Sequence, residues 1–151
     1  MLTATFDVLP ALAGSEIGVS DWLTIDQARI NLFAEATGDR QWIHVDSKRA
    51  SKELPGGRTI AHGYLTLSLI PALVQGLLKI EGLTRGINYG ADKVRFTHAV
   101  PEGSRVRARQ KLLSVEPRGG GLQLVSEITI EIEGEKKPAC VAETIAIIYN
   151  R

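Results

Sequence analysis

The stretch from Tyr64 to Leu78 constrains the fold of this chain more than any other part of its sequence. It contains no Asp or Glu and has almost no polar face, which is typical of a helix that protein surrounds on all sides. The stretch is too short, and too interrupted by polar residues, to span a membrane. Pro71 removes one backbone hydrogen bond, so it kinks this helix or marks the start of its regular part. We therefore predict a central apolar helix, entered from Thr59 and closed by Gly82.

The second half of the chain, from Ile87 onward, has the alternation of apolar and polar residues that indicates β-strands. Turn sequences separate the runs, as in antiparallel hairpins. Such a sheet has one face to bury, and the apolar helix offers a surface on which to bury it. We therefore predict a single α+β domain over residues 1–151, with an antiparallel sheet wrapped around the central helix. The predicted strands are 93–96, 105–109, 122–133 and 139–149, and the turns between them are 101–104, 119–121 and 134–135.

The first part of the chain predicts smaller elements. Thr24-Ile-Asp-Gln27 matches a capping box with Thr24 as the cap, and apolar residues at helical spacing follow it. Gly38 is the kind of residue that ends such a helix in the left-handed conformation. The remaining predictions are a short exposed helix within 45–52, a loop at 54–57, and a short strand at 6–9 that Pro10 ends.

Composition and charge exclude several classes of protein. The chain has 151 residues, of which 23% are charged, and a formal net charge of +1, so it lacks the basic excess of a nucleic-acid-binding protein. Cys140 is the single cysteine and has no partner for an intramolecular disulfide, which favours a reducing compartment. No Lys or Arg precedes Arg29, so the N-terminus lacks the basic start of a secretory or transit peptide. We expect a cytoplasmic protein that binds neither nucleic acid nor membranes.

Two ionisable residues follow the predicted helix directly. Asp39 comes after Gly38, and His44 lies five positions later on the same short loop. A carboxylate and an imidazole held this close can share a water molecule, take a proton from it and return one elsewhere, which is general acid–base chemistry near neutral pH. The alternative is structural, because Gly-Asp after a helix is an ordinary cap and turn, and a single loop histidine is usually solvated.

Three motifs follow one another along the chain. The first is Phe33-Ala-Glu-Ala-Thr-Gly-Asp-Arg-Gln-Trp-Ile-His44, in which an aromatic residue leads through Gly-Asp to a histidine. The second is Ile60-Ala-His-Gly-Tyr-Leu65, at the entry into the predicted central helix, and the third runs from Phe96 to Gly103. Together these motifs resemble those of the MaoC-like, (R)-specific enoyl-CoA hydratases, a family with the hot-dog fold. Ile87-Asn-Tyr-Gly90, followed by Val94-Arg-Phe96, resembles the branch related to nodulation protein N.

The resemblance implies a reversible addition of water to trans-2-enoyl thioesters, which gives (R)-3-hydroxyacyl thioesters. It assigns Asp39 and His44 to the acid–base pair, without dividing the roles between them. The backbone N–H of Gly63, at the start of the central helix, stabilises charge on the thioester oxygen in this scheme, and Tyr64 contacts substrate. The other explanation for Gly63 is a tight entry into the helix. The resemblance further implies a homodimer, an acyl-CoA or acyl-carrier-protein thioester as substrate, and no cofactor.

Other residues receive structural interpretations or serve as candidates. Three dispersed histidines, without Cys, Asp or Glu at ligand spacing, predict no metal site, and we interpret His62 and His98 as structural. Cys140 lies in an apolar strand and is expected to be packed rather than nucleophilic. Candidates for an apolar acyl tunnel are Tyr64, Leu65 and Trp42, and candidates for the CoA phosphates are Arg40, Arg58, Arg85 and Arg95.

The sequence also departs from the family pattern. Gln41-Trp42 stands where the family usually has Asn-Pro, and Pro71 stands where many relatives have a serine in the helix. Two rival functions stay open, a hot-dog thioesterase and a non-catalytic protein that binds acyl thioesters. Thioesterases of this fold typically carry an acidic residue on or near the central helix, and Tyr64–Leu78 has none. Retention of Asp39 and His44 counts against the binding protein.

Overall fold

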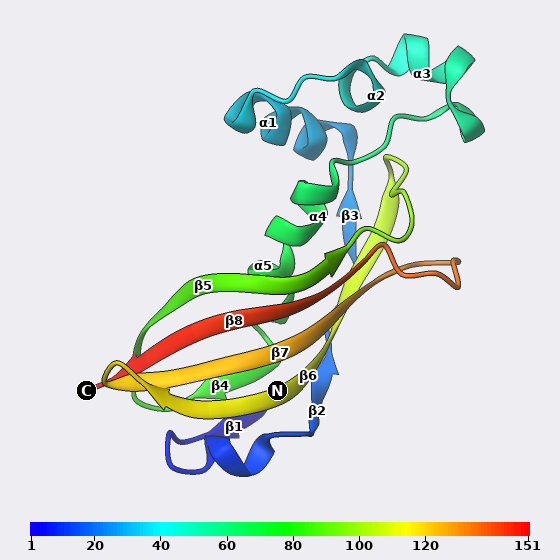
Figure 1. Ribbon diagram of the computed structural model, residues 1–151. Coiled ribbons are helices and arrows are strands. Elements are labelled where there is room, and N and C mark those ends of the chain that lie inside the picture. The colour runs from blue at the N-terminus through cyan, green and yellow to red at the C-terminus, as the bar shows by residue number, and fades with distance from the viewer.

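The computed structural model describes residues 1–151. The helices are α1 (Gln27–Thr37), α2 (Trp42–Val45), α3 (Ser47–Glu53), α4 (Gly63–Ser68) and α5 (Ile70–Val74), with 3-10 turns at Leu9–Leu12 and Pro55–Gly57. The strands are β1 (Leu2–Ala4), β2 (Glu16–Val19), β3 (Leu23–Ile25), β4 (Leu78–Ile80), β5 (Leu83–Arg95), β6 (Ser104–Arg118), β7 (Gly121–Ile132) and β8 (Cys140–Asn150). A curved sheet carries α4 and α5 against one face, and α1, α2 and α3 continue past the start of α4 (Figure 1). None of the helices is long and apolar enough to cross a membrane.

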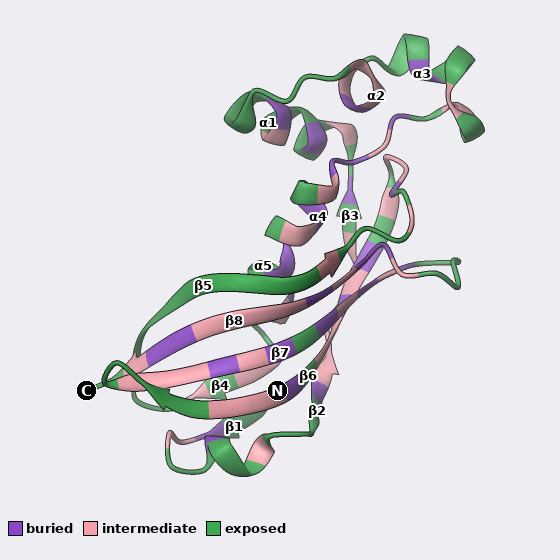
Figure 2. Cartoon of the chain, in the orientation of Figure 1, coloured by how far each residue is buried: buried purple, intermediate pink, exposed green.

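Antiparallel pairing joins the main sheet in the order β2-β6-β7-β8-β5, and β3 pairs with another part of β6. β6, β7 and β8 form the predicted meander. The prediction that consecutive strands are joined by hairpins is wrong for β5, because β5 does not neighbour β6, the next strand in the chain. The connection over 96–103 carries the chain across the sheet instead of making a hairpin, and β5 pairs with β8 at the opposite edge. β5 is therefore an edge strand, exposed over nearly its whole length (Figure 2).

The central helix packs on the inner face of the sheet and breaks where the sequence predicted. α4 and α5 separate at Leu69, and Pro71 lies in the first turn of α5, where its missing N–H costs no hydrogen bond. Leu65 and Leu69 are buried in one core cluster with inward-facing residues of the sheet such as Ile130. Protein does not surround the helix on all sides, however, because the Tyr64 side chain is 68% exposed. One face of α4 is thus open in the single chain.

Both ends of the central helix differ from the prediction. The helix begins at Gly63 rather than near Thr59, because Ile60 is extended and forms an isolated β-bridge with Pro101. It ends at α5, and Gly82 does not close it. Residues 78–80 form β4 instead, which pairs in parallel with β1, and Gly82 lies in the turn from β4 to β5. Strand pairing with a distant part of the chain overrides the local apolar pattern here.

The N-terminal part of the chain holds two further corrections. Thr24 lies in β3 and does not cap α1, because the Asp26 side chain accepts the capping hydrogen bond from Arg29 N–H at 2.8 Å. The strand predicted at 6–9 is wrong, since a 3-10 turn begins there at Leu9. α1 ends as predicted at Gly38, which has a φ of 81°. The exposed helix predicted within 45–52 is confirmed as α3.

Replacing Asp26 by Ala is expected to lower the free energy of unfolding by about 1 kcal/mol, because the N–H of Arg29 loses its capping acceptor. Asp26→Asn keeps an oxygen that can accept the same hydrogen bond, so it is the matched control and is expected to retain most of the stability. Chemical denaturation followed by circular dichroism measures both variants. An equal loss in the two would contradict the capping role.

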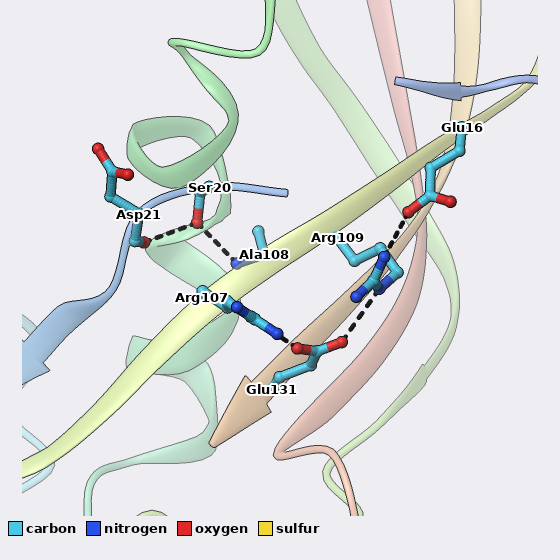
Figure 3. A network of polar contacts seen from close by, with 7 residues as sticks. All are labelled: Glu16, Ser20, Asp21, Arg107, Ala108, Arg109 and Glu131. Atoms are coloured by element: carbon cyan, nitrogen blue, oxygen red, sulfur yellow. Dashed lines mark hydrogen bonds and ion pairs between the residues drawn. The ribbon is translucent and has the colours of Figure 1, made fainter. Parts of the chain in front are cut away.

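A polar network on the outer face of the sheet connects β2 with β6 and β7 (Figure 3). Glu131 accepts hydrogen bonds from Arg107 Nε at 2.7 Å and from Arg109 Nε at 3.0 Å, and Arg109 also pairs with Glu16. Ser20 Oγ accepts from the N–H of Ala108 at 2.9 Å. Because the charged groups are partly exposed, each ion pair adds little stability. The Arg109–Glu16 pair and the Ser20 hydrogen bond are the contacts of this network that reach β2 and the residue after it.

Candidate active site

The segment that carries Asp39 and His44 packs against the residues that lead into α4. The N–H of Ile60 donates to the Ile43 carbonyl at 3.0 Å. The sequence predicted that His44 lies in a loop, but it lies in the short helix α2. A hydrogen bond from His44 N–H to the Gln41 carbonyl, at 3.0 Å, closes the turn of this helix. The helical turn places the His44 side chain inside the protein, where it is 7% exposed.

The His44 ring has one nitrogen committed and one available. Its Nδ1 lies 2.7 Å from the Ile60 carbonyl oxygen. A carbonyl can only accept, so Nδ1 carries the proton and Nε2 carries the lone pair. Burial lowers the pKa of His44 below its usual 6.5, and the neighbouring His62 acts in the same direction, while the Ile60 carbonyl and Asp39 oppose them. His44 is therefore neutral near pH 7, with Nε2 ready to accept a proton.

His62 stacks on the His44 ring and contacts Asp39. The two rings are stacked, with centroids 3.8 Å apart and planes inclined by 23°, and Phe33 packs against His62 at 4.9 Å. His62 Nε2 donates to the Asp39 carbonyl at 2.9 Å, and its Nδ1 is buried without a partner. His62 is hydrogen-bonded at the start of the central helix, as the sequence predicted. It also contacts both Asp39 and His44, which the sequence did not reveal.

Asp39 completes the group at the surface. Its side chain is exposed, and Oδ1 accepts a hydrogen bond from the N–H of Gln41 at 3.3 Å. Side-chain oxygen and nitrogen atoms of Asp39, His44 and His62 lie within 4.8 Å of one another. The structure thus brings the predicted pair together. It also corrects the view that the histidines are dispersed, because two of the three meet at Asp39.

Asp39, His44 and His62 make a group that could hold a metal ion or a hydrogen-bonded water. A water molecule needs only one hydrogen bond to a ring nitrogen and one to the carboxyl group of Asp39. General acid–base chemistry requires such a water.

Gly63 begins α4 directly after His62, and its N–H precedes the first hydrogen bond of the helix, which Leu65 N–H donates to the His62 carbonyl. A Cβ at Gly63 would lie 2.8 Å from Cδ2 of Phe96, so the ring of Phe96 requires glycine here. Tyr64 packs edge-on against the same ring, with centroids 5.7 Å apart. Both predicted substrate-binding residues therefore lie at the exposed start of α4, beside Phe96.

Gln27 and Thr59 form a second layer that sequence reasoning missed. Gln27 Nε2 donates to the His44 carbonyl at 2.7 Å, and Gln27 Oε1 accepts from the Thr59 hydroxyl. These bonds tie α1, α2 and the approach to α4 together. In the sequence Gln27 fits a capping box, and nothing in its spacing to His44 indicates the contact.

The predicted tunnel residues have different surroundings. Leu65 is buried in the core. Trp42 lies under the Arg49 guanidinium, whose carbon is 4.0 Å from the ring centroid. Tyr64 is the one of the three that is largely exposed.

The four arginines proposed as candidates for the CoA phosphates differ in their distance from the site and in their partners. Arg85 stacks on Tyr149 at the opposite end of β5 from Phe96, roughly 35 Å away for an extended strand. Arg40 is held by both carboxyl oxygens of Glu35, at 2.8 and 2.9 Å. The two that lie near the site without a carboxylate partner are Arg58 and Arg95, whose guanidinium groups donate to backbone carbonyls.

The remaining residues interpreted as structural have the expected surroundings. Cys140 is fully buried, and burial raises its pKa to about 11, so its thiol is neither exposed nor ionised near pH 7. His98 lies in the bend after β5, and its Nε2 is 3.6 Å from Glu135.

Comparison with known proteins places this geometry in a family. The family model for the MaoC-like domain matches residues 9–131. The chain belongs to the MaoC-like family. This MaoC-like protein is 54% identical over 138 residues to 3-hydroxyacyl-thioester dehydratase Z from Mycobacterium tuberculosis, a match that covers 91% of each chain. It is 49% identical over 142 residues to nodulation protein N from Rhizobium leguminosarum, covering 93% of this chain and 88% of that protein.

A solved structure confirms the fold. The unliganded (R)-hydratase PhaJ1 from Pseudomonas aeruginosa matches with a TM-score of 0.71 and 23% identity, over 92% of this chain and 83% of that chain. The MaoC-like protein therefore has the hot-dog fold that its motifs predicted, and its similarity to nodulation protein N is confirmed.

Proposed function

We propose that this protein is a 3-hydroxyacyl-thioester dehydratase that also works in reverse, as an (R)-specific hydratase of trans-2-enoyl thioesters. The observation that carries the proposal is the setting of His44, whose Nδ1 is bound to the Ile60 carbonyl while Nε2 is left as a base near Asp39. The 54%-identical relative from Mycobacterium tuberculosis is named for this class of reaction. The substrate is an acyl thioester of CoA or of an acyl carrier protein.

In the direction of hydration, a water molecule between Asp39 and His44 loses a proton to His44 Nε2, and its oxygen bonds to C3 of the enoyl group. Asp39 accepts a hydrogen bond from the other O–H group of the water, which keeps this hydrogen and becomes the hydroxyl on C3, and its carboxylate stabilises the imidazolium that forms. The imidazolium then returns its proton to C2, so one water has been added and both residues are restored. Charge that develops on the thioester oxygen is stabilised by the N–H of Gly63 at the start of α4.

The residues support a thioesterase less well, because thioesterases of this fold typically carry an acidic residue on or near the central helix, and α4 and α5 carry no Asp or Glu. Crotonyl-CoA supplied to the purified protein distinguishes the alternatives directly. Loss of the enoyl-thioester absorbance without release of free thiol is the expected result. Release of thiol would replace the proposal with a thioesterase. If neither occurs with short or long acyl chains, a non-catalytic binding protein is the better account.

The pH dependence of hydration tests the protonation state of His44. The active form is the neutral ring, and burial keeps its pKa below 6.5. We therefore expect the acidic limb of kcat/KM to have its midpoint below pH 6.5, with activity lost as the pH falls through this lowered pKa. An acidic limb with its midpoint above 6.5 would mean that His44 is not the proton acceptor.

We also propose that a second copy of this chain covers β5. Apolar side chains on this edge strand are exposed in the single chain, with Ile87 at 47% and Tyr89 at 55%. A long edge with unpaired backbone groups and apolar side chains needs to be covered. Sedimentation equilibrium is expected to give a dimer that Ile87→Lys weakens, whereas Leu32→Lys, on the exposed face of α1, leaves it intact. A monomeric wild type at micromolar concentration would overturn this proposal.

A further inference from the structure

A row of polar side chains crosses the otherwise apolar inner face of the sheet. Gln110 of β6, Ser126 of β7 and Thr144 of β8 lie at inward-facing positions, between apolar neighbours on each strand. The row coincides with a division in the core. The larger cluster contains Ala108, Ile128 and Ala142 on one side of it, and the smaller cluster contains Leu112, Leu124 and Ile148 on the other.

The polar groups of this row do not satisfy one another. Gln110 Nε2 donates to Ser126 Oγ at 3.2 Å, but Gln110 Oε1 is buried and has no hydrogen-bond partner. The Thr144 hydroxyl reaches only the Ser126 carbonyl, at 3.5 Å, which is the limit of a hydrogen bond. A buried polar atom without a partner costs free energy, so native proteins rarely retain one without a reason. The row therefore has hydrogen-bonding capacity to spare.

The three residues of this row line a cavity of about 540 Å³ between the central helix and the sheet, and the unpaired Gln110 Oε1 is buried beside it. Leu67, Pro71 and Val74 line it on the side of the helix, and Gln110, Ser126 and Thr144 are among the residues that line it on the side of the sheet. Most of the wall is apolar, with the polar row set into it. Such a combination of an apolar cavity with a few convergent polar groups is typical of a small-molecule site.

The helix connects this cavity with the proposed reaction centre. Gly63, Leu67, Ile70 and Val74 follow one another at intervals of four, three and four residues, so they lie on one face of α4 and α5. With a rise of about 1.5 Å per residue, the cavity begins about 6 Å beyond Gly63 and extends for about 10 Å more. An acyl chain whose thioester oxygen is bound at Gly63 N–H can follow this face into the cavity.

We propose that the cavity accommodates an acyl chain that carries a hydroxyl group well beyond the reacting carbons, and that Gln110, Ser126 and Thr144 bind this hydroxyl. The proposal rests on the proposed function and adds the class of acyl chain. A hydroxyl can donate to Gln110 Oε1, once a rotation of the amide group turns this buried oxygen toward the cavity, and it can accept from the Thr144 hydroxyl at the same time. A plain alkyl chain leaves Oε1 unpaired, and a carbonyl only accepts, so neither satisfies the row.

Pairs of substrates with equal chain length test the proposal. We would measure kcat/KM for hydration of trans-2-octenoyl-, decenoyl- and dodecenoyl-CoA, each with and without a hydroxyl on its terminal carbon. At one of these lengths the hydroxylated substrate is expected to be preferred about tenfold, because a site built to hydrogen-bond a hydroxyl discriminates against its absence. Absence of a preference at every length, with the plain substrates hydrated, overturns the polar-chain proposal and leaves the dehydratase standing. Failure to hydrate any of them removes both.

Variants of the row locate the effect. Gln110→Leu is expected to abolish the preference and to raise kcat/KM for the plain chain, with little change in melting temperature, because the loss of the hydrogen bond to Ser126 offsets the removal of an unpaired buried oxygen. Thr144→Val, which keeps the shape, is expected to weaken the preference. Gln123→Leu, on the outward face of β7 beside Arg118, is the matched control and should change nothing. A preference that survives both Gln110→Leu and Thr144→Val would assign the hydroxyl to another site and overturn the proposal.

Discussion

Replacing His44 by Gln is expected to lower kcat for crotonyl-CoA hydration about a thousandfold, because the proposed mechanism loses the group that takes the proton from water and returns it to C2. The Gln side chain can occupy the buried site and donate to the Ile60 carbonyl as Nδ1 does, but its amide does not accept a proton near neutral pH. The fold is therefore expected to survive, with KM little changed. Steady-state kinetics and the melting temperature measure the two effects separately.

Asp39→Asn separates the roles within the pair. Its amide still fills the exposed position and can accept from the N–H of Gln41, but it no longer stabilises an imidazolium at His44. We expect a loss of about a hundredfold or more in kcat. His98→Gln is the matched control, because His98 pairs with Glu135 away from the site. Near-normal hydration by His44→Gln in a folded protein would exclude His44 as the base and leave Asp39 as the single acceptor.

The parts of the site that the sequence predicted are those carried by local chain geometry. Gly38 ends α1 in the left-handed conformation, and this fixes where Asp39 follows. The one turn of α2 then places His44 close enough to Asp39 for the two to share a water. Both relationships span a few residues, so a motif can encode them. The stack of His62 on His44 joins residues from different elements, and it depends on how the start of α4 docks against α2.

The same distinction between local and long-range contacts explains where the prediction of the fold was wrong. Residues 78–80 continue an apolar run, but they become β4 because β1, from the other end of the chain, offers a strand to pair with. Thr24 has the side chain of a helix cap, yet it is committed to β3, and Asp26 takes the role. In each case a long-range backbone pairing outweighed a local preference worth about 1 kcal/mol. Local patterns located the elements, and pairing decided their ends and the place of β5.

Replacing Gly63 by Ala is expected to lower kcat/KM about a hundredfold and the free energy of unfolding by about 1–3 kcal/mol. The physical reason is contact rather than backbone conformation, because the φ of Gly63 is not positive. The added Cβ would lie 2.8 to 3.0 Å from three atoms of the Phe96 ring, closer than real Cβ atoms approach. Either the ring or the start of α4 must move, and movement of α4 displaces the N–H proposed to bind the thioester oxygen.

The double variant Gly63→Ala with Phe96→Ala decides why glycine is needed at this position. Phe96 is 43% exposed, so its own replacement is expected to cost less than removal of a fully buried ring. If clearance for the ring is the reason, the double variant regains both the stability and the kcat/KM of Phe96→Ala alone. If glycine instead keeps the path of the substrate to the backbone open, stability returns but activity does not. We expect both to return, because the Phe96 ring occupies the space that a Cβ would enter, and no substrate can approach through it.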